Sequence, residues 1–375
     1  MAGKRKAAAA PATDDAALGL VVQKQKTSAS GPALAAAAKQ TTSKPGQKFK
    51  PGAHARTSSL DAPIMLLEGH ENAVHCMEFS PDGSIVATAG ADKTLLLWNV
   101  RGECENFMMC KGHKNTISDL RWTADGDDIV TCSPDMTLRL WDATTGVKTK
   151  TMKGHSGFVN ACDVSKRLGD TLVISGGDDR SWKMWDLRVK KHVLSVADGF
   201  PLTSVAFGND TNHVYTAGIE ELVKQWDIRT VSSNNEGEAS NNPSLVLKGH
   251  ADTVTGLRVS PDGHKILSNS VDGTLKCWDI KPYCENNDRC VQTYSGHSHN
   301  FEKSQTRCAW SPDGARVASG SACRNVFVWD ATSAKIEYKL PGHLGSVHAV
   351  AFHPTEPILG SAGADRKVFL GELAE

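Results

Sequence analysis

The dipeptide Gly-His recurs along the chain with a period of about 42 to 45 residues, and this spacing constrains the fold more than any other feature. Most copies are followed about 28 residues later by Trp-Asp. The six copies are Gly69-His70, Gly112-His113, Gly154-His155, Gly249-His250, Gly296-His297 and Gly342-His343. A chain of this kind repeats one small unit and buries its core by packing neighbouring units together.

The pattern resembles the WD-repeat family, in which each copy forms one four-stranded blade of a β-propeller. Six repeats end at Trp98-Asn99, Trp141-Asp142, Trp185-Asp186, Trp226-Asp227, Trp278-Asp279 and Trp329-Asp330. A seventh opens at Gly342-His343 and ends at Gly371-Glu372. The fourth repeat has no Gly-His, but Thr216 and Trp226 keep the spacing of Thr88 and Trp98. We therefore predict an all-β, seven-bladed WD-repeat β-propeller over residues 61–375.

Each repeat has the pattern of short antiparallel strands joined by turns. In the first repeat we expect strands at 74–79, 85–89 and 95–98, with a turn at Pro81-Asp82-Gly83. In WD-repeat propellers the sequence repeat is offset from the blade. Residues 64–67 should therefore supply the outer strand of the last blade and close the ring, which leaves no long unpaired edge.

The first 60 residues differ in composition and are predicted to be a disordered basic tail. They contain ten Lys or Arg and two Asp, a net charge of +8, which leaves 32 basic and 40 acidic residues in the remainder. A nuclear import signal is one interpretation of Lys4, Arg5, Lys6, Lys24 and Lys26. A solvated tail without function and an organellar transit peptide are the alternatives. The scarcity of Arg and the acidic pair Asp14-Asp15 argue against a transit peptide.

No apolar run reaches the roughly 20 residues needed to span a bilayer, so we expect no membrane association. A nuclear location is expected from the interpretation of the basic clusters as an import signal. The ten cysteines include no Cys-x-x-Cys pair. We interpret them as reduced thiols and predict neither a metal nor another cofactor.

A Ser or Thr, a His and an Asp recur together and would resemble a catalytic triad if they occurred once. In each copy the Ser or Thr lies four residues before the Asp, and a Trp lies six residues after it. The sets are His70, Thr88, Asp92 and Trp98; His113, Thr131, Asp135 and Trp141; His155, Ser175, Asp179 and Trp185; and His250, Ser268, Asp272 and Trp278. An enzyme needs one activated nucleophile, whereas a recurring set suits a structural fastener. We predict these tetrads to be structural and the protein not to be an enzyme.

Three repeats break the set. The fourth has Glu220 at the acid position and no His, the sixth has Cys323 there, and the seventh keeps His343 and Asp365 but lacks the Trp. We expect these blades to lose part of the network.

A closer resemblance is carried by segments outside the tetrads. These are residues 58–67, the insertion 300–303, the stretch 338–343, and Ala351-Phe352-His353-Pro354 with Glu356-Pro357-Ile358. They are similar to the family of 40-kilodalton WD-repeat subunits of the U5 small nuclear ribonucleoprotein. The resemblance implies a non-catalytic scaffold in pre-mRNA splicing, a monomeric ring inside a large complex. It implies two protein partners, the large central splicing protein and the translocase GTPase of the U5 particle, with RNA contacted only indirectly. The loop 231–243 is an insertion that this resemblance does not cover.

The loops after each Gly-His and the turns around each tetrad acid should share one rim of the ring, where partners are expected to dock. On this rim Phe158 and the insertion residues Phe301, Glu302 and Lys303 are the candidate partner-binding residues. The alternative for both Phe side chains is packing in the core, and for the charged pair simple solvation.

Two other functions fit parts of the sequence. Residues 185–188 and 226–229 match the Trp-Asp-x-Arg pattern of substrate receptors of cullin-type ubiquitin ligases. The same Arg could serve only a surface ion pair worth about 0 to 1 kcal/mol. A signalling scaffold of the G-protein β type is a third possibility, but the heptads that it requires before the first blade are absent.

Overall fold

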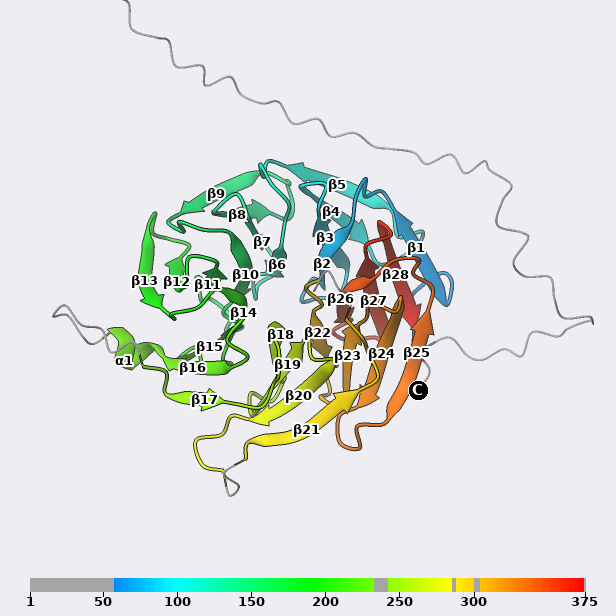
Figure 1. The fold of residues 1–375 in the computed structure, drawn as a ribbon. Helices are drawn as coiled ribbons and strands as arrows, with labels where there is room; N and C mark the ends of the chain where they lie inside the picture. Colours follow the sequence, from blue (N-terminus) through cyan, green and yellow to red (C-terminus); the bar gives the residue numbers. More distant parts are fainter. Residues whose placement is uncertain (1–56, 233–241, 285–287, 300–303, 374–375) are drawn as a thin grey trace, which may run out of the picture. The chain divides into compact units, whose positions relative to one another are not determined.

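The computed structural model describes residues 57–232, 242–284, 288–299 and 304–373. These residues form seven four-stranded antiparallel sheets, and the sheets succeed one another around a ring (Figure 1). The predicted seven-bladed β-propeller is therefore confirmed. Residues 1–56 of the predicted tail, with the candidate import signal, lie outside the described residues. Residues 57–60 were predicted to belong to the tail but pack on the ring, because Ser59 N donates to Glu356 Oε2 at 2.6 Å and Leu60 is buried in the core cluster of blades 7 and 1.

Each blade contains four strands in sequence order from the centre of the ring to its outer edge. Blade 1 contains β2 (Val74–Phe79), β3 (Ile85–Gly90), β4 (Thr94–Asn99) and β5 (Asn106–Lys111). Blade 2 contains β6 (Asp119–Trp122), β7 (Asp128–Ser133), β8 (Thr137–Asp142) and β9 (Lys148–Lys153). Blade 3 contains β10 (Val159–Val164), β11 (Leu172–Gly177), β12 (Ser181–Asp186) and β13 (His192–Ala197). Blade 4 contains β14 (Leu202–Phe207), β15 (His213–Gly218), β16 (Val223–Asp227) and β17 (Leu245–Leu247).

The remaining blades repeat this order, apart from the last strand of the ring. Blade 5 contains β18 (Val254–Val259), β19 (Lys265–Ser270), β20 (Thr274–Asp279) and β21 (Cys290–Ser295). Blade 6 contains β22 (Cys308–Trp310), β23 (Arg316–Gly320), β24 (Asn325–Asp330) and β25 (Ile336–Pro341). Blade 7 contains β26 (Val347–Phe352), β27 (Ile358–Gly363) and β28 (Lys367–Glu372), and its outer strand is β1 (Ile64–Glu68).

The turns between the first two strands of a blade are set by short polar side chains. In blade 1 the Ser80 hydroxyl donates to Asp82 Oδ1 at 2.6 Å, and Gly83 N donates to the Ser80 carbonyl at 2.9 Å. Gly83 has φ of 77°, and a Cβ added there would lie 2.4 Å from the His353 ring of blade 7. Glycine is needed at this position both for the backbone conformation and for the packing of blade 1 on blade 7.

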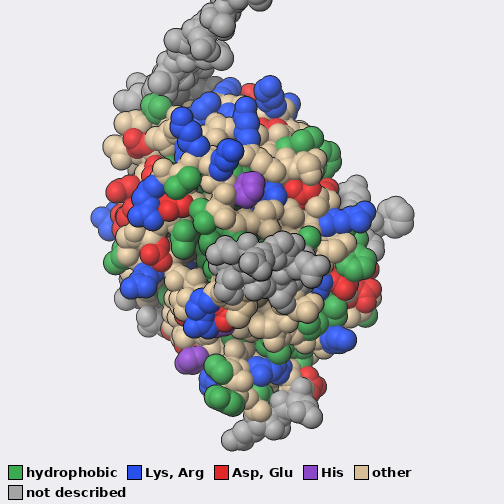
Figure 2. Space-filling model, turned by 90° about the vertical axis from the view of Figure 1, so that its left-hand side faces the viewer, with side chains coloured by type: hydrophobic (Ala, Val, Ile, Leu, Met, Phe, Trp, Pro, Cys, Tyr) green, Lys and Arg blue, Asp and Glu red, His purple; other side chains and the backbone are tan. Residues whose placement is uncertain are grey.

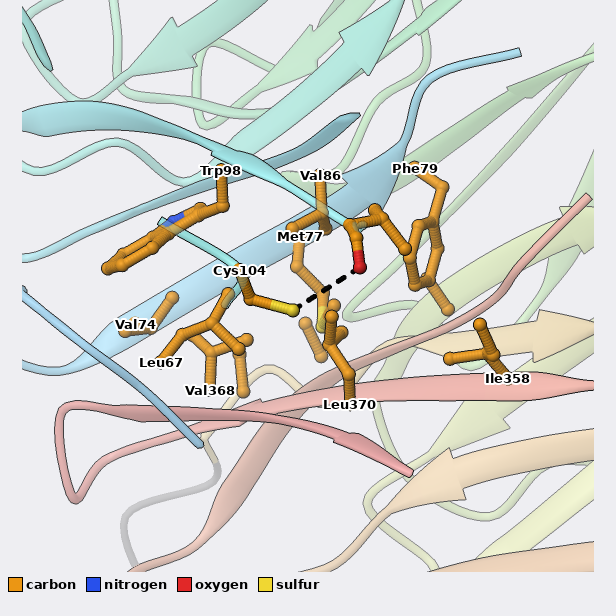
Figure 3. Close-up of a cluster of buried hydrophobic side chains, with 14 of the residues drawn as sticks. Leu67, Val74, Met77, Phe79, Val86, Trp98, Cys104, Ile358, Val368 and Leu370 are labelled. Carbon is orange, nitrogen blue, oxygen red and sulfur yellow. Dashed lines mark hydrogen bonds between the residues drawn. The ribbon is translucent and has the colours of Figure 1, made fainter. Parts of the chain in front are cut away.

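The ring closes between blades 7 and 1, where β1 pairs antiparallel with β28 over five residue pairs from Ile64–Gly371 to Glu68–Lys367. Side chains from both blades fill the seam behind this pairing, among them Leu67, Trp98, Val368 and Leu370 (Figure 3). A seam core that joins the two ends of the domain makes the ring one cooperative unit.

One helix, α1 (Ile228–Ser232), occurs among the described residues. The sequence placed Val231 in an insertion loop, but Val231 lies in α1 and its side chain is buried in the core of blades 3 and 4. Residues 233–241 of that insertion lie outside the described part of the chain. Within the described ranges no helix is long and apolar enough to cross a membrane.

Candidate functional site

The structure brings together all four tetrads that the sequence predicted. In blade 1 the Trp98 indole donates to Thr88 Oγ1 at 2.8 Å, and Thr88 Oγ1 lies 2.8 Å from His70 Nε2. The other ring nitrogen, His70 Nδ1, lies 2.6 Å from Asp92 Oδ2. The same three contacts measure between 2.7 and 2.9 Å in blades 2, 3 and 5.

The Asp of the tetrad also accepts hydrogen bonds from the backbone of the neighbouring rim loops. Asp135 accepts from the backbone N–H groups of Lys114 and Thr137 at 3.0 and 3.1 Å, in addition to His113. Burial opposes ionisation, but the hydrogen bonds from His113 and Thr137 hold the pKa of Asp135 well below its usual range. The hydroxyl of Thr131 is fully buried and accepts from Trp141. A buried hydroxyl that already accepts an indole N–H suits a fastener rather than a nucleophile.

Blade 4 replaces the missing His rather than losing the network. Asp198 stands 18 residues before Thr216, the same separation as between His70 and Thr88. The Thr216 hydroxyl accepts from Trp226 at 2.9 Å and donates to Asp198 Oδ2 at 2.6 Å. The Lys224 ammonium bridges Asp198 and Glu220, so the acid position and the His position are both carboxylates joined by one cation.

Asp198 was missed by the sequence reasoning, which looked only for His at that position. The signal was present, because Asp198 precedes the Ser/Thr position of its blade by the same 18 residues as His in blades 1, 2, 5 and 7. Desolvation disfavours the charged form of Lys224, but the hydrogen bonds and negative charges of Asp198 and Glu220 outweigh it and raise the pKa of the ammonium.

Blade 6 rearranges. His297 Nε2 lies 2.9 Å from Asn269 Oδ1 in blade 5, instead of contacting Ser319 of its own blade. The Trp329 indole donates to the Ser295 carbonyl at 3.1 Å. The His297 ring still packs against Trp329 of its own blade, with ring centroids 5.6 Å apart. Because Cys323 offers no carboxylate, the hydrogen bond of the imidazole is made to the neighbouring blade instead.

Blade 7 keeps the His–Ser and His–Asp contacts without the Trp. His343 lies 3.0 Å from both Ser361 Oγ and Asp365 Oδ1. The edge of the Phe369 ring packs against His343 with ring centroids 4.7 Å apart. An aromatic ring from the last strand therefore covers the imidazole, but it has no N–H to donate to Ser361.

The rim that carries the tetrad acids also carries exposed apolar side chains. Phe158 is 48% exposed, so it does not pack into the core. On the same rim of the next blade, Phe200 and Ile219 are 46% and 48% exposed. The two blades meet directly below, where the Asn160 amide donates to the Leu202 carbonyl at 2.8 Å. The predicted rim residues Phe301, Glu302 and Lys303 lie outside the described residues.

The two Trp-Asp-x-Arg arginines pair with the aspartates of their own motifs. Arg188 Nη2 lies 2.8 Å from Asp186 Oδ2, and Arg229 Nη2 lies 2.7 Å from Asp227 Oδ2. Both Arg side chains remain more than half exposed. Each arginine therefore forms a surface ion pair, which was the alternative to binding a ligase adaptor.

A buried guanidinium reaches across the central channel. Arg307, just before β22, donates to the carbonyls of Ser118 and Asn160 at 3.4 and 3.0 Å, which ties blade 6 to blades 2 and 3. Above it, His75 and His348 stack with ring centroids 5.2 Å apart. These residues line a hollow of about 230 Å³ at the channel mouth. Burial first, and then the neighbouring His348, lowers the pKa of His75 to about 4.

The cysteines do not assemble into a site among the described residues. Cys76, Cys162 and Cys308 are buried on the first strands of their blades, and burial raises the pKa of each thiol. Cys323 alone is exposed. No group of three or more His, Cys, Asp or Glu side chains that could hold a metal ion occurs in the described ranges.

Seven four-stranded blades fastened by these networks define a WD-repeat β-propeller. The family model for the WD domain, G-beta repeat, matches six segments, residues 61–99, 103–142, 146–186, 241–279, 288–330 and 334–370. The unmatched stretch between 186 and 241 contains the first three strands of blade 4, where Asp198 and Lys224 replace the usual set.

Several curated proteins are similar over most of the ring. The U5 small nuclear ribonucleoprotein 40 kDa protein of Homo sapiens is 47% identical over 318 residues, covering 85% of this chain and 86% of the human protein. The protein of that name from Dictyostelium discoideum is 42% identical over the same shares. The pre-mRNA-splicing factor cwf17 of Schizosaccharomyces pombe is 41% identical and covers 85% of this chain and 90% of its own length. The chain belongs to the WD-repeat family that contains these U5 40 kDa proteins.

Proposed function

We propose that this chain is a non-catalytic protein scaffold of the U5 small nuclear ribonucleoprotein and acts in pre-mRNA splicing in the nucleus. The observation that carries the proposal is the 47% identity to the human U5 40 kDa protein over 318 residues, 85% of this chain. A second splicing factor, at 41% identity over 85% of this chain, supports the same assignment.

The geometry supports binding rather than catalysis. The hydroxyls of Thr88, Thr131, Ser175 and Ser268 are fully buried, and each accepts a Trp indole N–H. These networks hold the rim loops in place, so the rim is a preorganised surface on which partners can dock with little loss of conformational entropy. By the family resemblance, its partners are the large central splicing protein and the translocase GTPase, and RNA is held indirectly.

Phe158 and Phe200 are the rim side chains that we propose as anchors. Each is nearly half exposed, and they stand on adjacent blades joined by the contact of Asn160 with Leu202. Aromatic side chains at the centre of an interface dominate its binding energy, and truncating one such anchor typically costs about 2 kcal/mol or more. Phe301 stays a candidate for the same role.

The test is a native pull-down of the tagged full chain from nuclear extract, with mass spectrometry for splicing proteins and hybridisation for U5 RNA. Recovery of both is expected. Phe158→Ala with Phe200→Ala should lower recovery at least tenfold without changing the melting temperature. The matched control is Leu168→Ala with Tyr283→Ala, which removes two side chains that are 76% and 94% exposed elsewhere on the ring. Equal recovery of both double variants would remove Phe158 and Phe200 as anchors.

The same pull-down tests the ligase-receptor alternative. Because Arg188 and Arg229 are paired with their own aspartates, we expect Arg188→Ala with Arg229→Ala to leave recovery of U5 RNA unchanged. Recovery of a ligase adaptor without U5 RNA, abolished by this double substitution, would replace the splicing proposal by the receptor.

A further inference from the structure

The seam between blades 2 and 3 is locked on its outer side by one lysine. The Lys150 ammonium, on β9, donates to the carbonyls of Asp186 and Leu187 at 3.2 and 2.7 Å and to that of Val189 at 2.5 Å. These carbonyls belong to the turn between β12 and β13 of blade 3. The turn is therefore held against β9, and the side chains that follow it are placed along the seam.

Four further lysines line this seam, and we call Lys153, Lys183, Lys190 and Lys191 the seam lysines. Gly154, which follows Lys153, packs so closely on blade 3 that an added Cβ would lie 3.1 Å from His192 Nδ1. Lys183 reaches Ser195 Oγ at 2.6 Å across β12 and β13.

The seam carries an excess of positive charge. His192 lies among the seam lysines, and its pKa is lowered by desolvation and then by the nearby Lys183, His155 and Lys191. Among the residues that the structure describes, none of the seam lysines is in an ion pair with a carboxylate. Figure 2 shows Lys and Arg side chains gathered in the upper part of the face that it presents, the side of the ring on which Figure 1 places β9.

Two corresponding turns elsewhere on the ring carry carboxylates next to their cations. In blade 1 the turn before β5 has Arg101 together with Glu103 and Glu105. In blade 6 the turn before β25 has Lys335, with Glu337 two residues later. In a ring whose sequence from residue 61 onward is net acidic, the seam is a region where an anionic partner gains by charge complementarity.

Apolar side chains flank the lysines. Val189 and Val193 are 49% and 55% exposed. Residues 186–197 include no Phe, Tyr or Trp, the side chains on which unpaired bases stack. Lysines that lie between exposed valines suit a chain that carries both acidic and apolar side chains, whereas a phosphodiester backbone would leave the valines without a partner.

We propose that the seam between blades 2 and 3 binds an extended acidic segment of a partner protein. Carboxylates of the segment pair with Lys153, Lys190 and Lys191, and its apolar side chains cover Val189 and Val193. The proposal extends the scaffold function and names the chemistry of one of its protein partners. It places a second contact on the outer edge of the ring, separate from the rim that carries Phe158.

The test uses the purified full chain and a fluorescein-labelled peptide of twelve residues that alternates Glu and Val, followed by fluorescence anisotropy at low salt. The seam variant is Lys153→Gln, Lys190→Gln and Lys191→Gln, three exposed residues. The control variant, Lys114→Gln, Lys281→Gln and Lys335→Gln, makes the same change in net charge at exposed positions outside the seam. The basic tail is identical in all three proteins, so its attraction for the peptide cancels from the comparison.

We expect the seam variant to bind the peptide about tenfold more weakly than the unsubstituted chain, the loss of three surface ion pairs of ordinary strength. The control variant should bind within about twofold of it, and a peptide that alternates Glu and Ser should bind more weakly than the Glu-Val peptide. Equal affinity of the seam and control variants would overturn the proposal. A twelve-nucleotide oligouridine that loses more affinity than the peptide would overturn it in favour of a nucleic-acid surface.

This outcome is separable from that of the proposed function. Peptide binding is measured on purified protein and needs no splicing particle. Failure to recover U5 RNA in the pull-down, with seam-dependent peptide binding intact, would reject the splicing assignment alone. Recovery of U5 RNA with no difference between the seam and control variants would reject the seam alone.

Discussion

Replacing Asp135 by Ala tests whether the tetrads stabilise the ring. Asp135 Oδ2 lies 2.8 Å from His113 Nδ1, and both side chains are almost wholly buried, with 5% of the Asp135 side chain exposed. Truncation leaves the His113 N–H without its partner inside the blade, while the N–H groups of Lys114 and Thr137 near the surface can bind water. A buried donor left unsatisfied costs about 1 to 3 kcal/mol, which sets the expected loss of stability.

The loss converts into a small but measurable shift in melting temperature. For a ring of roughly 310 residues, the entropy of unfolding is on the order of 0.65 kcal/mol/K, so a loss of about 2 kcal/mol lowers Tm by about 3 °C. Differential scanning calorimetry of the full chain resolves this shift. Asp127→Ala is the matched control, because Asp127 is an exposed aspartate of the same blade.

The comparison between the two variants can refute the structural role of the tetrad. If Asp135→Ala and Asp127→Ala lowered Tm equally, the hydrogen bond from His113 to Asp135 would contribute nothing and the view of the tetrad as a fastener would be wrong. Asp135→Asn keeps the shape of the side chain and one acceptor oxygen, so its Tm should fall between those of the unsubstituted chain and Asp135→Ala.

Three further predictions concern single side chains elsewhere in the ring. Asp198→Ala should destabilise the ring by about 3 kcal/mol, because it leaves the buried Lys224 ammonium with one carboxylate instead of two; a Tm unchanged from the parent would contradict this account of blade 4. Cys323 should be the first thiol alkylated by iodoacetamide at neutral pH, since hydrogen bonds, against some burial, lower its pKa; a fast phase that survives Cys323→Ser in mass spectrometry would count against it. The pKa of His75 is about 4 in the fold, below its ordinary value, so its contribution to stability is complete above about pH 6.5 and is lost as the pH falls towards 4. His75→Gln should therefore lose less Tm between pH 7 and pH 5 than the unsubstituted chain, and equal losses would refute this assignment.

The comparison of blades 4 and 6 shows why tetrad substitutions have different consequences. In blade 4 a carboxylate replaced the imidazole, and Lys224 supplied the positive charge that two nearby carboxylates require. In blade 6 the acid was replaced by Cys323, and the imidazole of His297 turned to the amide of Asn269. A buried polar group must find some partner, so the network is rebuilt from whatever donors and acceptors lie within reach.

The amino-acid sequence by itself determined the number of blades, the four complete tetrads and the strand at residues 64–67 that pairs with β28. These features could be predicted because each depends on spacing within one repeat or on the known offset between repeat and blade. The separation of His70 from Thr88 is repeated at His113 and Thr131, and hydrogen bonds over such short separations follow from strand geometry.

Only the tertiary structure decided how neighbouring blades meet. The contacts of Lys150 with the turn at 186–189, of His297 with Asn269 and of Arg307 with Asn160 join different blades. No periodicity within a repeat encodes them, because they depend on how far each sheet is rotated against the next and on which long side chains then meet. The positive charge of the seam between blades 2 and 3 has the same origin: its lysines come from separate strands and form one surface only when the two sheets pack together.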